Sequence, residues 1–271
     1  MLSDAHIHTD FCDGLNTAEE MVKAALERGL CALGFSGHSY TAFDGDCCMS
    51  RAATGAYRQE IARLKAKYHR QIALFCGIEQ DFFSCEPTGG YAYIIGSVHY
   101  LADTENKKYY TIDYTGSQLC QCIAELCGGS PEAFVQKYFA QVAQMAQSLR
   151  PDIIGHFDLL RKLNAADRFF AENSPAYRQA AQAALRVCAQ AGCLLELNTG
   201  GAYRGYRQDF YPAERELAYW RSLGGEVIIT SDAHEAAALC YGFDEARQLL
   251  KEVGFERQAV LSARGFTYQG L

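Results

Sequence analysis

Short apolar runs alternate along this chain with longer stretches that suit helices. The runs are brief and often β-branched, as buried parallel strands are. They predict strands at residues 2–7, 31–36, 72–78, 92–98, 152–156, 193–198 and 226–231. Repeated strand-then-helix order predicts an α/β protein, built either as a barrel or as a doubly wound sheet.

Helix start signals support this alternation. Residues 17–20 read Thr-Ala-Glu-Glu, which is a capping box. Ser130-Pro131 and Ser174-Pro175 each place a capping hydroxyl before a proline at the first helical position. Residues 100–130 are less regular, and we expect an insertion there. Because no linker or low-complexity stretch divides the sequence, we expect a single domain over residues 1–271.

Composition narrows the functional classes. Hydrophobic residues make up 49% of the 271 residues and charged residues 21%, which is ordinary for a folded globule. The formal net charge of -7 argues against a protein that binds the nucleic-acid backbone through a basic surface. An anionic small substrate stays compatible with this charge, because a metal cluster can supply local positive charge.

No apolar run has transmembrane length, and no basic-then-apolar leader precedes Asp4. We therefore expect a cytoplasmic protein with no membrane partner. The 12 cysteines are interpreted as reduced thiols that pack as small apolar residues. A structural zinc site from Cys120, Cys122 and Cys127 is the weaker alternative, because the paired C-x-x-C spacing is absent.

Residues that commonly ligate metals stand where the predicted strands end. His6 and His8 follow the first strand, and alternation along an extended segment points both imidazoles the same way. Asp13 lies in the loop after this strand. The other strands end in, or are followed by, further ligand-type side chains: His38, Glu79, His99, His156, Asp232 and His234. His69 is the exception, because it closes a helix and is expected on the surface.

Core packing does not explain so many ionisable groups at strand ends, since burying them is costly unless they are paired or bound to metal. Functional groups gather at the carboxyl ends of the strands in a barrel, which favours that architecture. Imidazole with carboxylate suits Zn, Mn or Fe. The ligands are too many for one ion, and a carboxylate such as Glu79 can bridge two. The sequence thus predicts two or three divalent metal ions.

These residues carry a resemblance. The chain resembles the PHP (polymerase and histidinol phosphatase) superfamily, and within it the histidinol-phosphate phosphatase branch. The matching segments are residues 4–8, 77–81, 95–100, 155–162, 196–201 and 231–234. The resemblance implies a distorted (β/α)7 barrel with a trinuclear metal site at the C-terminal ends of the strands. Two positions depart from the family pattern: Asp13 stands where the family often has His, and Gly37 where it often has Asp.

The resemblance also implies how the metals are shared. The first would be held by His6, His8, Glu79 and Asp232. The second would be held by Glu79, His99 and His156. The third would be held by Asp13, His38 and His234. Asp81 and Asp158 each follow a metal ligand by two residues and are expected to orient ligands of the site.

The function so implied is that of a metal-dependent phosphomonoesterase, which hydrolyses L-histidinol phosphate to L-histidinol and phosphate in histidine biosynthesis. The expected nucleophile is a hydroxide that bridges metals held by Glu79 and Asp232. Arg161 and Arg204 follow strand ends and are expected to bind the phosphate, with Lys162 and Arg207 as weaker candidates. The residues alone do not assign the general acid.

Three alternatives remain at this stage. One is a related phosphoesterase that acts on nucleotides or another small phosphate ester. Another is a metal hydrolase of the amidohydrolase type, although no Lys stands at a strand end to bridge its metals. The last is a non-catalytic sensing module, which the complete ligand set disfavours.

Overall fold

The computed structural model describes residues 1–271 as an α/β fold with parallel sheets. The smaller sheet is three-stranded, in the order β1 (Ser3–Asp4), β2 (Ala32–Phe35) and β3 (Ala73–Cys76). The larger sheet is seven-stranded. Its order is β12 (Gly265–Gly270), β11 (Arg257–Ser262), β10 (Val227–Thr230), β9 (Leu194–Asn198), β8 (Ile153–Ile154), β5 (Ile94–Ser97) and β4 (Ile78–Asp81). Only the β11–β12 pair in these sheets is antiparallel.

Isolated backbone contacts join the two sheets where their strands end. Ile7 forms a parallel bridge with Ala233, and His38 forms one with Glu79. The N–H of His8 donates to the carbonyl of Ala233 at 2.8 Å, and the N–H of Ser39 donates to the carbonyl of Glu79 at 2.9 Å. The segments that follow β1 and β2 therefore attach the smaller sheet to the larger one, at the ends of the strands that carry the ligand-type residues.

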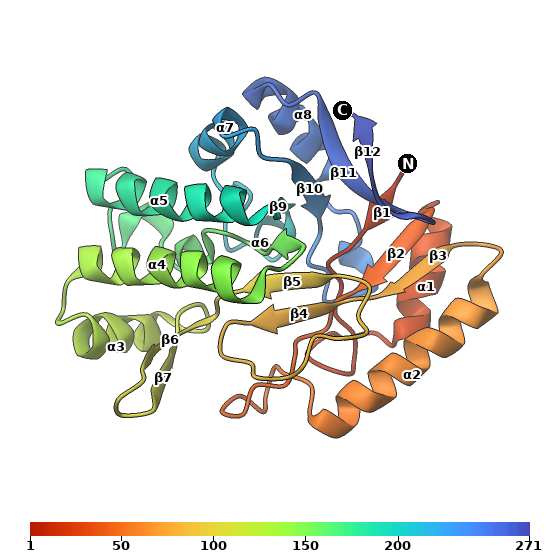
Figure 1. Ribbon diagram of the computed structural model, residues 1–271, viewed down its shortest axis with the longest axis horizontal. Coiled ribbons are helices and arrows are strands. Elements are labelled where there is room, and N and C mark those ends of the chain that lie inside the picture. Colours follow the sequence, from red (N-terminus) through yellow and green to blue (C-terminus); the bar gives the residue numbers. More distant parts are fainter.

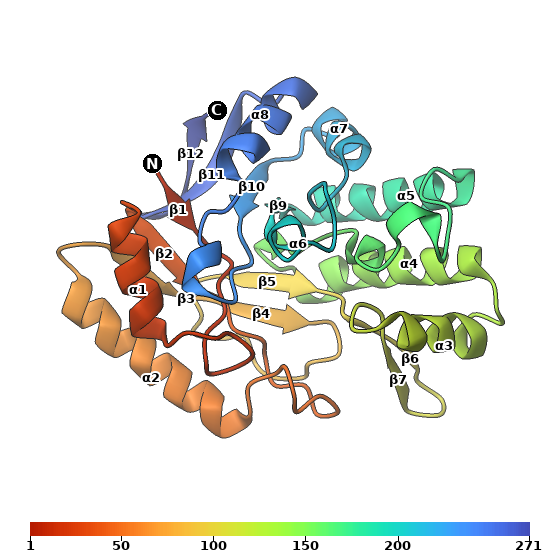
Figure 2. The same ribbon diagram turned by 180° about the vertical axis from the view of Figure 1, so that it is seen from behind.

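Helices cover the outer side of the strands (Figures 1 and 2). Beside the smaller sheet lie α1 (Ala18–Glu27) and α2 (Arg51–Tyr68). Around the larger sheet follow α4 (Pro131–Leu149), α5 (Pro175–Ala191), α7 (Glu214–Ser222) and α8 (Phe243–Val253). The short α6 (Gly200–Tyr203) follows β9. None of these helices has the length and apolar character needed to cross a bilayer.

The predicted helix starts are confirmed. Thr17 caps α1, and both halves of its capping box with Glu20 are present. Ser130 and Ser174 accept from backbone N–H groups at the starts of α4 and α5, each followed by proline in the first turn. Local side-chain chemistry thus sets these boundaries before any tertiary contact forms.

The run at residues 72–78 differs from the prediction of one strand that ends in Glu79. The strand is interrupted at Gly77, where a Cβ would lie 2.4 Å from the ring of Tyr93. The strand β3 ends at Cys76 in the smaller sheet, and a new strand, β4, places Glu79 in the larger one. The hydrophobic pattern cannot show this change of sheet, because it is set by pairing: β3 pairs with β2, and β4 pairs with β5.

Residues 100–130 contain regular structure that the sequence did not reveal. Strands β6 (Tyr100–Asp103) and β7 (Lys108–Thr111) form an antiparallel hairpin, and α3 (Gly116–Leu126) follows them. The C-terminal pair β11 and β12 was also not predicted. The hairpin and α3 lie beside α4, at the same end of the molecule (Figure 1).

Candidate metal centre

The carboxyl ends of the strands bring the predicted ligands together. Three groups have ligand atoms that all lie within 4.8 Å of one another. They are His8, Asp13, His38 and His234; then His6, His8 and Asp232; then His38, Glu79 and His99. His156 is outside these groups, but its Nε2 lies 2.9 Å from Glu79 Oε1.

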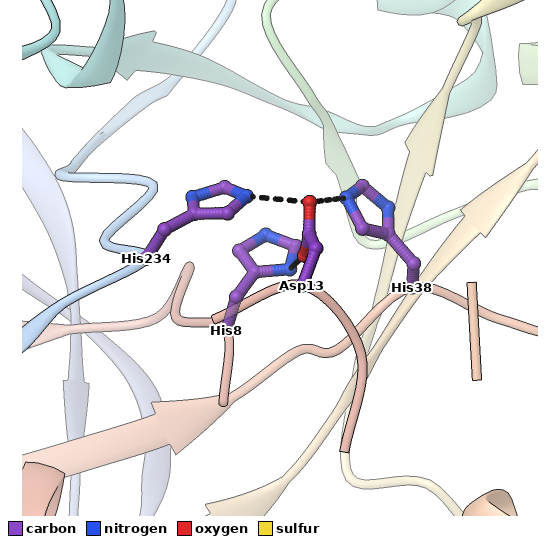
Figure 3. A group of neighbouring side chains, drawn as sticks. All are labelled: His8, Asp13, His38 and His234. Atoms are coloured by element: carbon purple, nitrogen blue, oxygen red, sulfur yellow. Dashed lines mark ion pairs between the residues drawn. The ribbon is translucent and has the colours of Figure 1, made fainter. Parts of the chain in front are cut away.

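Figure 3 shows the first group, in which the carboxylate of Asp13 lies among three imidazoles. Its Oδ2 is 3.2 Å from Nε2 of His234 and 3.6 Å from Nε2 of His38. Its Oδ1 is 3.5 Å from Nδ1 of His8. A carboxylate thus occupies the position at which the family often has His, and it faces the same imidazoles.

A tight turn delivers Asp13 to this point. The N–H groups of Cys12 and Gly14 both donate to the carbonyl of Thr9, each at 3.0 Å. A Cβ on Gly14 would lie 2.5 Å from the Thr9 nitrogen, so only glycine permits this close return of the backbone.

Glu79 is the hub of the site. Its side chain is 1% exposed, and imidazoles approach both of its oxygens. Near Oε2 lie His38 Nδ1 at 2.9 Å, His6 Nε2 at 3.3 Å and His8 Nε2 at 3.4 Å. Near Oε1 lie His156 Nε2 at 2.9 Å and His99 Nε2 at 3.5 Å. The hydroxyl of Ser97 donates to Oε1 at 2.6 Å and fixes the carboxylate from behind. A carboxylate that has imidazoles near both of its oxygens can bridge two metal ions.

A buried carboxylate that the sequence analysis did not assign orients the His6 imidazole and holds the backbone of His156. Glu196, in β9, lies 2.5 Å from Nδ1 of His6 through Oε1 and accepts the backbone N–H of His156 at 2.5 Å through Oε2. Thr230 Oγ1 also donates to it, at 2.6 Å. Because Nδ1 of His6 is bound here, its Nε2 faces the site. The available signal was a lone carboxylate in the apolar run 193–198.

Asp81 has the orienting position expected of it, and Asp158 does not. Asp81 Oδ2 lies 3.3 Å from Nδ1 of His99 and accepts the His99 backbone N–H at 3.0 Å. Asp158 instead accepts from Arg161 and from the N–H of Ala213, each at 3.0 Å. Asp81 thus orients His99 and not Glu79, the ligand that stands two residues before it.

The electrostatics follow from dense packing of opposite charges. Burial would raise the pKa of Glu79, but His38, His6 and His156 hold that pKa well below its usual range. Burial opposes charge on His6, yet Glu196, Asp232 and Glu79 raise the pKa of His6 above its usual value. Burial and the neighbouring His234 and His38 lower the pKa of His8 to about 3. The lowered pKa favours the neutral imidazole of His8, which is the form that offers a lone pair to a metal.

Several buried ligand atoms have no hydrogen-bond partner. They are Nε2 of His6, Nε2 of His8, Oδ1 of Asp13 and Oε2 of Glu79. Leaving such an atom unsatisfied costs about 1–3 kcal/mol, and more when it is charged. Imidazole nitrogens and carboxylate oxygens that converge on one another suit divalent cations. The residues present thus fit a metal centre.

Two of the predicted ligands have a strained backbone. Asp232 has φ 48 and His156 has φ 20, in the left-handed region that non-glycine residues seldom adopt. Such strain persists where the surrounding structure over-determines it, and it clusters at functional sites.

The predicted phosphate-binding arginines lie in different places. Arg204 lines the cavity, and its Nη2 donates to Asp232 Oδ2 at 2.9 Å. Arg161 is 2% exposed and does not line that cavity. Its guanidinium is bound by Asp158, Glu172 and Asp209. This differs from the role expected for Arg161, because its donors are already taken up by carboxylates.

The neighbouring lysine lies in the cavity instead. Lys162 Nζ pairs with Asp113 Oδ2 at 2.9 Å and lies over the ring of Tyr206, 4.8 Å from its centroid. Lys162, Asp113 and Tyr206 all line the cavity, which has a volume of about 450 Å³ and reaches the predicted ligands. Lys162 and Arg204 are thus the cations that face the metal centre.

The remaining expectations concern residues away from the ligands. All the cysteines are free thiols, and none of the groups that could hold a metal includes Cys120, Cys122 or Cys127. His69 is exposed, as expected, and caps the end of α2.

The family follows from comparison with known proteins. The family model described as the PHP domain matches residues 4–200, which is well over half of the chain. The chain belongs to the PHP family. The matched residues of this PHP protein include every predicted ligand except Asp232 and His234.

Two curated PHP relatives match over nearly their full length. A Deinococcus radiodurans protein named "Probable histidinol-phosphatase" is 29% identical over 93% of this chain and 94% of its own. The histidinol-phosphatase of Bacillus subtilis is 28% identical over 89% of this chain and 96% of its own.

A solved structure supports the same fold. It is the histidinol phosphate phosphatase of Lactococcus lactis, complexed with zinc, L-histidinol and phosphate. It superposes with a TM-score of 0.72 at 23% identity, and the match covers 98% of each chain.

Proposed function

We propose that this PHP protein is a histidinol-phosphatase that hydrolyses L-histidinol phosphate to L-histidinol and phosphate in histidine biosynthesis. The observation that carries the proposal is the hub at Glu79, where imidazoles surround both oxygens of one buried carboxylate. The two curated relatives, both named for this activity, match nearly the whole chain.

The ligands divide among two or three divalent ions as the family resemblance implies. His6, His8, Glu79 and Asp232 would hold one ion, Glu79, His99 and His156 a second, and Asp13, His38 and His234 a third. When bound, such ions act as Lewis acids toward phosphate oxygens and make water a nucleophile at neutral pH. Zinc is the first choice, since the Lactococcus lactis protein binds it, and manganese or iron suits the same ligands.

The residues of the chain itself hold the ester in place. Arg204 is fixed by Asp232, and Lys162 is fixed by Asp113, so both cations are oriented before substrate arrives. Positive groups held in this way stabilise the charge that builds on a phosphoryl group during transfer. We assign phosphate binding to Arg204 and Lys162, in place of the pair Arg204 and Arg161.

We also propose that the two sheets form one distorted (β/α)7 barrel, and that residues 1–271 make a single domain. The bridges from Ile7 to Ala233 and from His38 to Glu79 support closure. So does a small core cluster that draws on strands of both sheets. It contains Ala5, Ala32, Tyr93, Ile95, Ile153, Ile228, Ala259 and Leu261.

The test is phosphate release by protein purified without chelator. L-histidinol phosphate is compared with adenosine monophosphate and p-nitrophenyl phosphate at matched concentrations. We expect kcat/KM to be highest for L-histidinol phosphate. Preferred turnover of the nucleotide would replace the proposal with the related phosphoesterase, and turnover of none in metal-loaded protein would overturn both.

A further inference from the structure

The cavity has an aromatic side that none of the roles above uses. The ring of Tyr100 lies 6.2 Å from that of the predicted ligand His99. Phe43 meets Tyr100 edge to face at 4.9 Å and stacks on Tyr109 at 3.7 Å, with 12° between their planes. A row of rings thus begins beside the metal centre and runs outward along the cavity.

This side is built by segments that do not belong to the strand ends of the metal centre. Phe43 comes from the loop after His38, and Tyr109 comes from the hairpin of β6 and β7. Phe83 packs edge to face against Tyr109 at 5.3 Å and supports the stack from behind. Phe43 is nevertheless 37% exposed and Tyr109 40% exposed, so their outer surfaces are free to meet a ligand.

Carboxylates lie at the same end of the cavity. The hydroxyl of Tyr100 donates to Asp44 Oδ2, and the N–H groups of Asp46 and Cys47 donate to Asp44 Oδ1 at 3.0 and 3.1 Å. Asp44 is therefore held in one orientation. Neither Asp44 nor Asp46 forms an ion pair, whereas Asp113 on the other side is paired with Lys162. Asp44 and Asp46 therefore carry negative charge that no cation balances, and they lie beside the aromatic stack.

We propose that Phe43, Asp44, Asp46 and Tyr109, called here the aromatic–acidic wall, bind the leaving-group end of the substrate. The wall suits an alcohol that carries a flat ring and a protonated amine. The ring lies on the stacked aromatics, and the ammonium faces the two aspartates. This assignment rests on the proposed function and adds the residues that select the alcohol.

The cations and the unpaired carboxylates of the cavity come from different segments, which makes the selection directional. Lys162 and Arg204 follow β8 and β9, and Asp44 and Asp46 follow β2. The phosphate is drawn to Lys162, Arg204 and the metal centre, and the cationic end is drawn to Asp44 and Asp46. A substrate with a phosphate at one end and an ammonium at the other fits in only one direction. An alcohol that carries a second phosphate is repelled by the aspartates, so a bisphosphate ester is rejected.

The test uses four phosphate esters that separate ring from amine. L-histidinol phosphate has both, 2-phenylethyl phosphate has the ring, O-phosphoethanolamine has the amine, and ethyl phosphate has neither. For Phe43→Ala we expect kcat/KM to fall about tenfold with the ring-bearing esters and far less with the others. For Asp44→Asn we expect a fall of about fivefold with the amine-bearing esters and less with the others. Both changes should act mainly on KM.

Tyr268→Ala is the matched control, because this aromatic is 49% exposed on β12 and does not line the cavity. Circular dichroism and metal content confirm that each variant is folded and loaded. An equal fall in kcat/KM with all four esters would contradict the proposed role of the wall, because its side chains would then act through the metal centre. Unchanged preference for L-histidinol phosphate in both variants would overturn the wall and leave the proposed function standing. No such preference in the wild type would overturn both.

Discussion

Two clusters of buried charge in this protein differ in how their charges are satisfied. Around Arg161, a guanidinium meets the carboxylates of Asp158, Glu172 and Asp209. Around Glu79, imidazoles and carboxylates crowd together, and ligand atoms of His6, His8 and Glu79 have no hydrogen-bond partner. The first cluster has its own counter-charges, and the second needs cations from outside. Oδ1 of Asp158 in the first cluster also lacks a partner, so neither burial nor one unsatisfied atom marks a functional site. Several unsatisfied ligand atoms that converge on one point do.

Removal of metal should have the largest effect, and only on the second cluster. Dialysis against a chelator should abolish phosphate release, and added zinc, manganese or iron should restore it. Saturating metal should also stabilise the fold by about 3 kcal/mol at a concentration 100 times its Kd. Thermal unfolding of stripped and reloaded protein measures this. Full activity in protein shown to be metal-free would contradict the metal centre.

Glu79→Gln should come next, because it removes the charge that the imidazoles share. We expect loss of bound metal together with a fall in kcat of about 10²–10³-fold or more. Elemental analysis and phosphate release on the same sample check both. Wild-type turnover in this variant would show that Glu79 is not a metal ligand.

Arg161→Ala should lower the stability of the fold and leave the rate of phosphate release unchanged. It leaves buried carboxylates without their cation, so we expect a loss of about 3–5 kcal/mol in the free energy of unfolding. The matched control is Arg257→Ala, whose exposed pair with Glu226 should contribute less than about 1 kcal/mol. Denaturant titration gives both values. A raised KM with unchanged stability would instead restore phosphate binding to Arg161.

Glu196→Gln should weaken metal binding without removing a ligand. It replaces the carboxylate that holds Nδ1 of His6, and the loss of such a partner lowers metal affinity about 10–100-fold. Competition with a chromogenic zinc chelator measures the affinity. If excess metal did not recover activity, Glu196 would have a role beyond orienting His6.

Arg204→Ala should give the smallest of these effects, roughly a tenfold fall in kcat/KM, because one charged hydrogen bond to the phosphate is lost. Steady-state kinetics on L-histidinol phosphate check it. Since Arg204 also touches Asp232, metal content is measured in parallel. Unchanged kcat and KM would remove Arg204 from the phosphate site.

Much of the fold could be predicted from local pattern. The runs at residues 31–36 and 193–198 correspond to β2 and β9, and the capping signals at Thr17, Ser130 and Ser174 hold. The hairpin of β6 and β7 and the strands β11 and β12 were not predicted, because these segments carry fewer apolar residues and their pairing is set by their partner strands.

The sequence by itself determined the family and the ligand types, because imidazole and carboxylate at strand ends must converge wherever parallel strands share one edge. It did not determine which cation faces the cavity. Arg161 and Lys162 are neighbours at the end of a 3₁₀ turn, where consecutive side chains point about 120° apart. Only the tertiary structure decided that Arg161 meets Asp158, Glu172 and Asp209 while Lys162 faces the metal centre. The aromatic–acidic wall was hidden for the same reason, since it forms only where a loop and a hairpin far apart in sequence meet.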